Sequence, residues 1–195
     1  QAALLNMTPL QYGRERMKEL QQKLLKCDLY VMGQKNEDPD DKARTAKVSA
    51  SSQRDGCEAR QVISGITRRE GPCSNLWCSE GLAPEGETLT LRLAEATAVH
   101  EVYLVFDPDL SEERCISVSK AFMDKEPLGV AKTLVKDYCV ELLLGDTVVE
   151  KRTVTANHQR GNILKFDAVT CDGVRLVVQS TNGCEDARVY EIRVY

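Results

Sequence analysis

The residues best able to do chemistry are spread thinly along this 195-residue chain. The two histidines, His100 and His158, are far apart and have no Cys-x-x-Cys partner, so a zinc site has little support. A thiol nucleophile needs a base, and only folding could bring Cys57, Cys73 or Cys78 next to His158. The sequence therefore assigns no catalytic residue.

Carboxylates and glycines add no clear site either. Asp107 and Asp109 follow a strand-like segment and could form a carboxylate pair, but Asp-Pro-Asp is typical of a polar turn. Rossmann-type FAD binding requires a Gly-x-Gly-x-x-Gly turn between a strand and a helix. None of the twelve glycines forms that pattern, so this chain is expected not to bind FAD by that route.

Eight cysteines are compatible with disulfides, although a chain of this length does not need them. Cys139 and Cys171 lie in or beside apolar strand-like segments, where cysteine usually behaves as a small hydrophobic residue. We expect reduced thiols in a reducing compartment, with a bridge between Cys73 and Cys78 as the alternative.

Composition argues against several partners. The net charge is −4 and the basic residues are scattered along the sequence, whereas a nucleic-acid binder needs a clustered basic face. No apolar run approaches the roughly 20 residues of a membrane span, and the start lacks the features of a signal peptide. We expect no nucleic-acid partner and no membrane partner. The start at Gln1 rather than Met suggests a piece of a longer polypeptide.

The chain divides into three segments. Residues 1–33 predict a helical connector, because Thr8 and Pro9 form a start signal and apolar residues then recur every three or four positions. This helix either docks on a neighbouring surface or packs on the core of its own chain. Residues 34–44 are polar and contain a central proline, as expected of a linker. Residues 45–195 are expected to form one domain.

Within 45–195 the hydrophobic pattern has a period of two, which predicts short strands. The clearest hairpin joins 138–144 to 147–155 through Gly145 and Asp146, a two-residue turn that suits paired strands. The other predicted strands are 48–52, 89–93, 101–106, 164–166, 174–179 and 188–195. No helical pattern separates them, so we predict a mainly β fold, an antiparallel jelly-roll β-sandwich preceded by one N-terminal helix.

The final predicted strand shows one further pattern. Tyr190, Ile192 and Val194 alternate with the charged residues Glu191 and Arg193. Because side chains alternate between the faces of a strand, this pattern predicts one apolar and one wet face.

Several motifs occur in an order that carries a family resemblance. They are the Ala-Ser-Ser strand within 48–52, the segments 62–68 and 74–79, and the groups 106–110, 135–138, 157–160 and 181–183. Together they resemble the C-terminal discoidin-like, galactose-binding-type β-sandwich of bacterial FAD-dependent oxidoreductases. The resemblance implies that the helix leaves a missing catalytic domain of the same polypeptide, and that FAD would be bound only there.

The resemblance also implies a candidate calcium site. Discoidin-like modules often hold calcium near an Asp-Gly turn and the Glu of the last strand, which match Ser64-Gly65 and Glu191 here. Ser64, Thr67 and Glu191 are the candidate ligands. A hydroxyl in place of a carboxylate weakens such a site. A hydrogen-bonded turn beside a surface carboxylate is therefore the favoured interpretation.

Sugar-binding relatives use loops at one end of the sandwich, commonly with an aromatic platform. The loop 180–186 has no aromatic residue. The candidate ligand-binding residues are Trp77, Arg160 and Asn182. Packing is favoured for the sole tryptophan, and turn-stabilising hydrogen bonds explain the other two equally well. We expect a non-catalytic accessory domain that packs on its catalytic part, a partner subunit or a glycan; the alternative is an autonomous carbohydrate-binding module.

Overall fold

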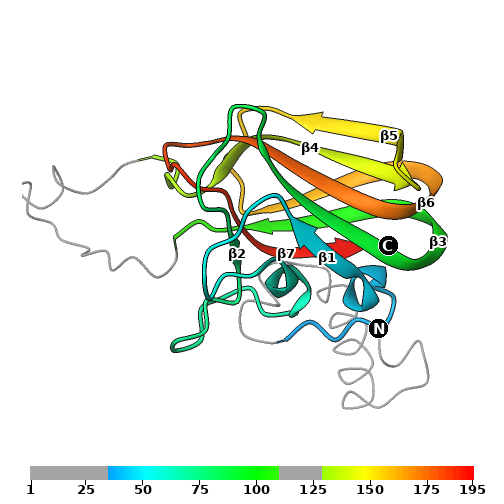
Figure 1. Cartoon of the computed structure of the whole chain (residues 1–195), viewed down its shortest axis with the longest axis horizontal. Coiled ribbons are helices and arrows are strands. Elements are labelled where there is room, and N and C mark those ends of the chain that lie inside the picture. Colours follow the sequence, from blue (N-terminus) through cyan, green and yellow to red (C-terminus); the bar gives the residue numbers. More distant parts are fainter. Residues whose placement is uncertain (1–34, 110–128) are drawn as a thin grey trace, which may run out of the picture.

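Two long strands organise the fold, β3 (Glu87–Phe106) and β6 (Gly161–Thr181). They pair antiparallel along most of their length in the computed structural model, which describes residues 35–109 and 129–195. The register shifts twice, between Arg92 and Thr97 and again shortly afterwards, and the ribbon bends there (Figure 1). Each long strand therefore contributes to two layers. The predicted helix of the segment 1–33 lies outside the described residues.

The remaining strands add to the two ends of this ribbon. In one layer β1 (Lys47–Ala50) pairs with β3, while β4 (Val135–Leu144) joins β6 to β5 (Thr147–Val154). In the other layer, called the second layer below, β7 (Arg188–Val194) lies between β3 and the short β2 (Trp77–Cys78). Every strand pairing is antiparallel, which confirms the predicted mainly β sandwich.

Local patterns located the strands well and missed their continuity. The predicted hairpin is present as β4 and β5, with Gly145 at a φ of 60° in its turn. The predicted strands 89–93 and 101–106 are parts of β3, and 164–166 and 174–179 are parts of β6. Side chains at the bends are largely exposed on both faces, so the alternation fades although the strand pairing resumes beyond them.

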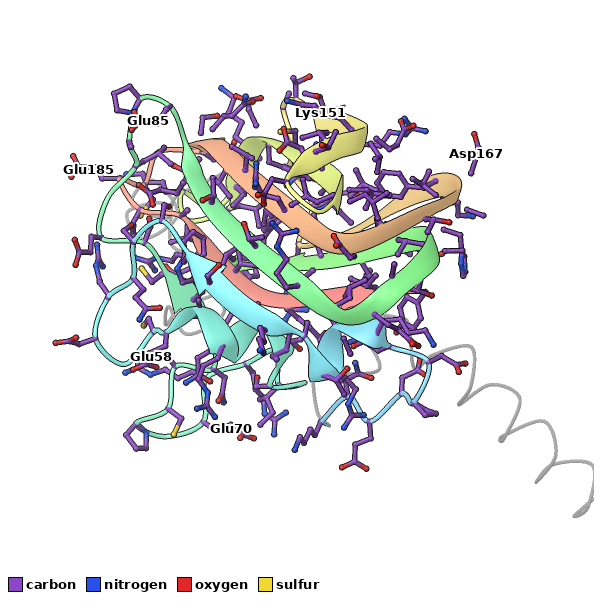
Figure 2. All side chains as sticks on the ribbon, turned by 45° about the vertical axis from the view of Figure 1, so that its right-hand side comes forward. Glu58, Glu70, Glu85, Lys151, Asp167 and Glu185 are labelled. Carbon is purple, nitrogen blue, oxygen red and sulfur yellow. The ribbon has the colours of Figure 1, made fainter. Side chains whose placement is uncertain are left out.

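The core fills the space between the two layers. Phe106 and Tyr138, from different layers, contact edge to face with ring centroids 5.0 Å apart. Charged side chains such as Glu85, Asp167 and Glu185 point outward (Figure 2). None of the helices within the described ranges has the length and apolar character needed to cross a membrane.

The predicted wet face of the last strand is wrong: Glu191 is 1% exposed and Arg193 is fully buried. β7 is an inner strand, and its outer face is covered by the short helices η2 (Lys42–Thr45) and η3 (Ala59–Ile63). A bulge at Tyr190 also shifts the alternation. A period of two cannot reveal that a polar face is covered by another part of the chain.

The segment expected to be a linker is hydrogen-bonded to the C-terminal end of the chain through Asp38 and Asp41. Asp41 accepts a 3.0 Å hydrogen bond from the amide of Val194, and Asp38 accepts one of 3.1 Å from the hydroxyl of Tyr195. Burial raises the pKa of Asp41 to about 6, although its hydrogen bonds to backbone amides oppose that rise. These polar contacts secure the N-terminal part of the described chain over the second layer.

We predict that Gly65→Ala destabilises the domain more than Gly56→Ala. Both glycines have positive φ, 79° and 75°, so an alanine is strained at either position. At Gly65 the added Cβ would also lie 2.6 Å from the carbonyl oxygen of Asn36, whereas at Gly56 it meets nothing within 4 Å. Denaturant unfolding should show a loss of about 1 kcal/mol for Gly56→Ala and clearly more for Gly65→Ala. Equal losses would contradict the tight docking of the segment.

Candidate functional site

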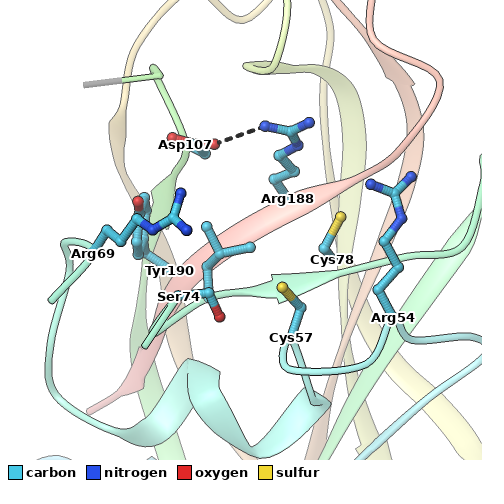
Figure 3. Close-up of a pocket in the computed structure, with 9 residues that line it drawn as sticks. Arg54, Cys57, Arg69, Ser74, Cys78, Asp107, Arg188 and Tyr190 are labelled. Atoms are coloured by element: carbon cyan, nitrogen blue, oxygen red, sulfur yellow. Dashed lines mark hydrogen bonds and ion pairs between the residues drawn. The ribbon is translucent and has the colours of Figure 1, made fainter. Parts of the chain in front are cut away.

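A pocket of about 200 Å³ lies at one end of the second layer (Figure 3). Its walls come from the loops on either side of η3, from β2, from the end of β3 and from the start of β7. The pairing of Cys78 with Arg188 in neighbouring strands brings these segments together. The lining residues are Arg54, Cys57, Arg69, Ser74, Leu76, Cys78, Asp107, Arg188 and Tyr190.

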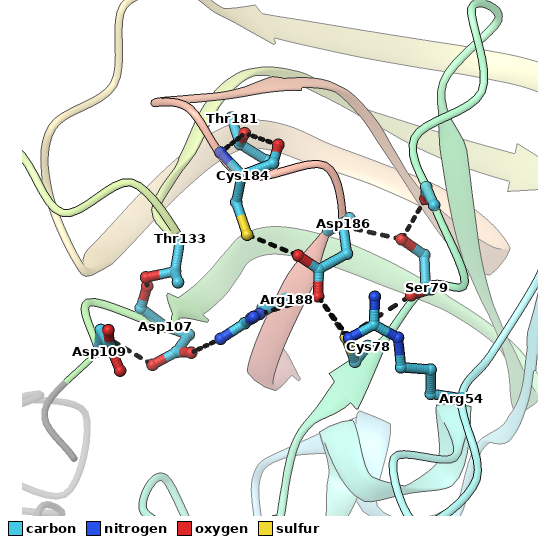
Figure 4. A network of polar contacts seen from close by, with 12 residues as sticks. Arg54, Cys78, Ser79, Asp107, Asp109, Thr133, Thr181, Cys184, Asp186 and Arg188 are labelled. Carbon is cyan, nitrogen blue, oxygen red and sulfur yellow. Dashed lines mark hydrogen bonds and ion pairs between the residues drawn. The ribbon is translucent and has the colours of Figure 1, made fainter. Parts of the chain in front are cut away.

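The carboxylate of Asp186 lies directly behind this pocket and is only 3% exposed (Figure 4). The thiols of Cys78 and Cys184 donate to its two oxygens at 2.8 and 2.6 Å. Arg188 donates through Nε at 3.0 Å, and Arg54 pairs at 3.2 Å. Burial opposes ionisation, but the hydrogen bonds from the two thiols and Arg188 outweigh it and lower the pKa of Asp186 to about 2.

The same contacts keep the thiols neutral. Burial, followed by the hydrogen bond to Asp186, raises the pKa of Cys78 to about 12, and the same causes raise the pKa of Cys184. A thiol with a raised pKa is a weak nucleophile. Within the described ranges all six cysteines are free, and the alternative bridge between Cys73 and Cys78 is not formed.

Arg188 connects the start of β7 to the end of β3. Besides Asp186, its guanidinium contacts Asp107 at 3.4 Å. Burial opposes the charge on Arg188, but the two carboxylates outweigh it and raise the pKa of Arg188. The other oxygen of Asp107 accepts the amide of Asp109 at 2.9 Å, which confirms the predicted polar turn. Burial raises the pKa of Asp107 despite these contacts.

Two further arginines line the pocket, on opposite sides of it (Figure 3). The side chain of Arg54 is 50% exposed and contacts only one oxygen of Asp186. Arg69 is exposed and forms no hydrogen bond or ion pair with any residue that the structure describes. Basic residues that are scattered along the sequence are therefore gathered here by the fold.

The turn with two of the candidate calcium ligands follows η3, which packs on β7. Ser64 accepts a hydrogen bond of 3.2 Å from the amide of Ile66, as expected of a hydrogen-bonded turn. Thr67 is fully buried, and its carbonyl oxygen accepts a 2.6 Å bond from the guanidinium of Arg160. A cation from the chain itself therefore occupies one of the oxygens that calcium would need.

Glu191, the third candidate ligand, is not the surface carboxylate that we expected. It is buried and accepts a 2.7 Å hydrogen bond from Nε of Arg193, whose guanidinium lies 4.8 Å from the ring centre of Tyr103. Arg193 thus compensates the charge that a calcium ion would otherwise balance. Among the described residues no group of three or more His, Cys, Asp or Glu is arranged to hold a metal ion. The calcium site stays a prediction.

Two of the candidate ligand-binding residues have structural contacts. Trp77 has no exposed surface, and its indole nitrogen donates to the carbonyl oxygen of Ser52 at 2.9 Å, which favours packing over ligand stacking. The amide of Asn182 donates to the carbonyl oxygens of Leu134 and Asn157 at 3.0 and 3.2 Å. It joins three loops, as the turn-stabilising interpretation expects.

Arg160 lies behind the pocket rather than in it. Its guanidinium is 5.9 Å from the ring centre of Tyr190, which lines the pocket, and it also donates to the backbone of Thr67. Arg160 can therefore position the pocket wall without touching what the pocket holds.

Sequence reasoning named Cys57, Cys78 and Asp107 as candidates, but it missed the arginines that line the pocket. Arg54, Arg69 and Arg188 belong to segments that are distant in sequence, and each arginine alone is an ordinary surface residue. The one local signal was the spacing of Asp186 and Arg188, because residues two apart share a face in extended chain. The pairing of β2 with β7 supplied the rest.

Comparison with known proteins identifies the fold. No protein-family model and no curated protein matches this chain. Among solved structures, the lectin domain of lectinolysin, complexed with Lewis B antigen, is similar with a TM-score of 0.60 and 16% identity over 80% of this chain and 96% of that domain. A fucose-binding module from Streptococcus pneumoniae gives a TM-score of 0.59 at 12% identity over 80% and 96%.

A third similar structure is the family 32 carbohydrate-binding module of NanJ from C. perfringens, in complex with galactose. Its TM-score is 0.56 at 16% identity over 79% of this chain and 96% of the module. At such low identities the likeness defines the fold alone. The chain has the discoidin-like, galactose-binding-type β-sandwich that the sequence motifs predicted.

We predict that Asp186→Asn destabilises the domain by about 3 kcal/mol at neutral pH, because it leaves Arg188 and Arg54 without their shared carboxylate. The pKa of Asp186 lies below its ordinary value of 3.8, so its ionised form contributes full stability above about pH 4. That contribution is lost as the pH falls to about 2, and the variant should lack this part of the acid dependence. Thermal unfolding between pH 2 and 7 measures both effects. Asp146→Asn, at a side chain that is 98% exposed, is the matched control and should change stability by less than about 0.5 kcal/mol.

We predict that calcium does not raise the unfolding temperature of this chain, because Arg193 and Arg160 already satisfy oxygens of the candidate site. The measurement compares thermal unfolding in excess calcium and in a chelator. Glu191→Gln should destabilise the protein equally in both conditions, since it leaves Arg193 buried without its carboxylate. A calcium-dependent stabilisation that disappears in Glu191→Gln would instead establish a calcium site.

Proposed function

We propose that this chain is a non-catalytic carbohydrate-binding module that holds a sugar in the pocket beside Arg188. The observation that carries the proposal is the fold likeness, which extends over about 80% of this chain and nearly the whole length of the sugar-binding domains compared. Because one fold can host several functions, the pocket must support the same conclusion.

The size and lining of the pocket support a sugar ligand. At about 200 Å³ it is smaller than the roughly 300–1,000 Å³ of pockets for drug-sized ligands, so a single sugar ring suits it better than a long segment. Its walls offer guanidinium donors and the carboxylate of Asp107, with Leu76 as an apolar surface. Sugar rings present hydroxyls and C–H groups, and this lining can contact both.

The protonation states of Cys78 and Asp186 suit structural roles better than acid–base catalysis. Cys78 is a neutral thiol that donates to Asp186, and Asp186 is an ionised group enclosed by donors. A general acid or base works best with a pKa near the working pH, and these two groups are shifted away from neutrality in opposite directions. Neither group can exchange protons readily at neutral pH.

The resemblance to the C-terminal domain of FAD-dependent oxidoreductases implies that this chain is part of a longer polypeptide with a catalytic domain. The three solved structures compared above are sugar-binding domains by name, and they support the module rather than the oxidoreductase partner. The accessory role stays a prediction. It is compatible with the proposal, because an accessory domain can also bind a glycan for its catalytic part.

We predict saturable binding of at least one monosaccharide or short glycan, measured by isothermal titration against neutral and acidic sugars. Ser74→Trp should abolish binding, because the indole fills the space between the pocket walls. Ser49→Trp introduces the same side chain at an exposed position on β1, outside the pocket lining, and should bind normally. The proposal would be overturned if none of the sugars tested bound to the chain, or if Ser74→Trp bound sugar as the wild type does.

A further inference from the structure

We infer that the pocket selects a sugar that carries a carboxylate, a uronic acid unit, and that Arg69 binds this group. The inference rests on the proposed function, since it assigns the chemical class of the sugar in the same pocket. It follows from the charge of the walls, from the absence of an exposed aromatic platform among the lining residues, and from the geometry of guanidinium groups.

The arginines that line the pocket are not all compensated by carboxylates of the described residues. Arg188, at the inner wall, is compensated by Asp186 and Asp107 at 3.0 and 3.4 Å. Arg54 shares Asp186 with Arg188 and keeps half of its side chain exposed. Arg69 has no counter-charge among the described residues. Among the described residues three guanidiniums therefore face two carboxylates, and Arg69 is the arginine without a partner.

The lining lacks the surface on which a neutral sugar ring would stack. Among the described lining residues Tyr190 is the only aromatic one, and it is 4% exposed, with Arg160 on its ring at 5.9 Å. Trp77, on the adjoining strand, is fully buried. Affinity must therefore come mainly from hydrogen bonds, and bonds between ionised partners are roughly twice as strong as neutral ones.

The shape of the donors favours a carboxylate. A guanidinium presents paired N–H groups in a rigid plane, which matches the two oxygens of a carboxylate in a bidentate contact. Arg69 is exposed and forms no hydrogen bond with other described residues, so its guanidinium can rotate toward a ligand. Arg69 lies beside Tyr190 at the wall of this small pocket, where it can reach a ring that the pocket holds (Figure 3).

The test uses sugars that differ only in the acidic group. Methyl glucuronide is compared with methyl glucoside, and methyl galacturonide with methyl galactoside, by isothermal titration of the full chain. At least one acid should bind about tenfold or more tighter than its neutral partner, which is about 1.4 kcal/mol. Its affinity should fall as sodium chloride is raised, because salt screens exposed charges.

Variants of Arg69 distinguish the effect of its positive charge on binding from the effect of its planar guanidinium group. Arg69→Gln should weaken binding of the acid about tenfold or more and leave the neutral sugar nearly unchanged, while Arg69→Lys should fall between wild type and Arg69→Gln. Arg44→Gln is the matched control, because Arg44 is an exposed arginine of η2 outside the pocket lining and should bind like wild type. Arg54 and Arg188 are not used, since their loss would disturb Asp186.

The reactivity of the Cys57 thiol gives a second measurement of binding that is independent of isothermal titration. Cys57 is a half-buried free thiol that lines the pocket. Bound uronic acid should slow its alkylation, followed by mass spectrometry, whereas the neutral sugar at the same concentration should not. Exposed Cys73 should be alkylated at the same rate with either sugar.

The outcomes separate the two proposals. If no sugar binds, the proposed function itself fails. If neutral and acidic sugars bind equally, or if Arg69→Gln changes neither, the chain is still a sugar-binding module but the uronic acid inference is wrong. If methyl glucoside 6-sulfate binds as tightly as methyl glucuronide, the preference for a carboxylate is overturned.

Discussion

The antiparallel pairing of β3 with β6 is the constraint on which the rest of the structure depends. Both strands bend, so each one belongs to both layers, and every other strand adds to this ribbon or to a strand paired with it. Its bends decide which end of β3 meets β1 and which end meets β7. The layers are therefore joined by hydrogen-bonded backbone as well as by the apolar core between them.

A second constraint is the compensation of charges buried beside β7. Asp186 is enclosed by two thiols and two guanidiniums, and Glu191 is paired with Arg193. A buried carboxylate without such partners would be costly, so these contacts also hold the loops that carry them. Among the arginines that line the pocket the compensation is incomplete. That difference makes the pocket electrostatically suited to a ligand.

The comparison with sugar-binding domains and the chemistry of the pocket point in the same direction from independent evidence. The fold likeness concerns the backbone, since identity is only 12–16%, and carries no residue-level information about ligands. The proposed preference for an acidic sugar rests instead on the pocket residues, and above all on Arg69.

The sequence by itself determined the β class, the hairpin at Gly145 and Asp146, the turn at Asp107 and the type of sandwich, because alternation and turn chemistry act over a few residues. Tertiary structure alone decided that Glu191 is buried, that Trp77 is in the core and that the predicted linker is bound to β7 through Asp41. It also decided that distant arginines meet around one pocket. Burial and charge compensation depend on pairings between segments far apart in the chain. The hydrophobic periodicity of one segment does not indicate which other segment it pairs with.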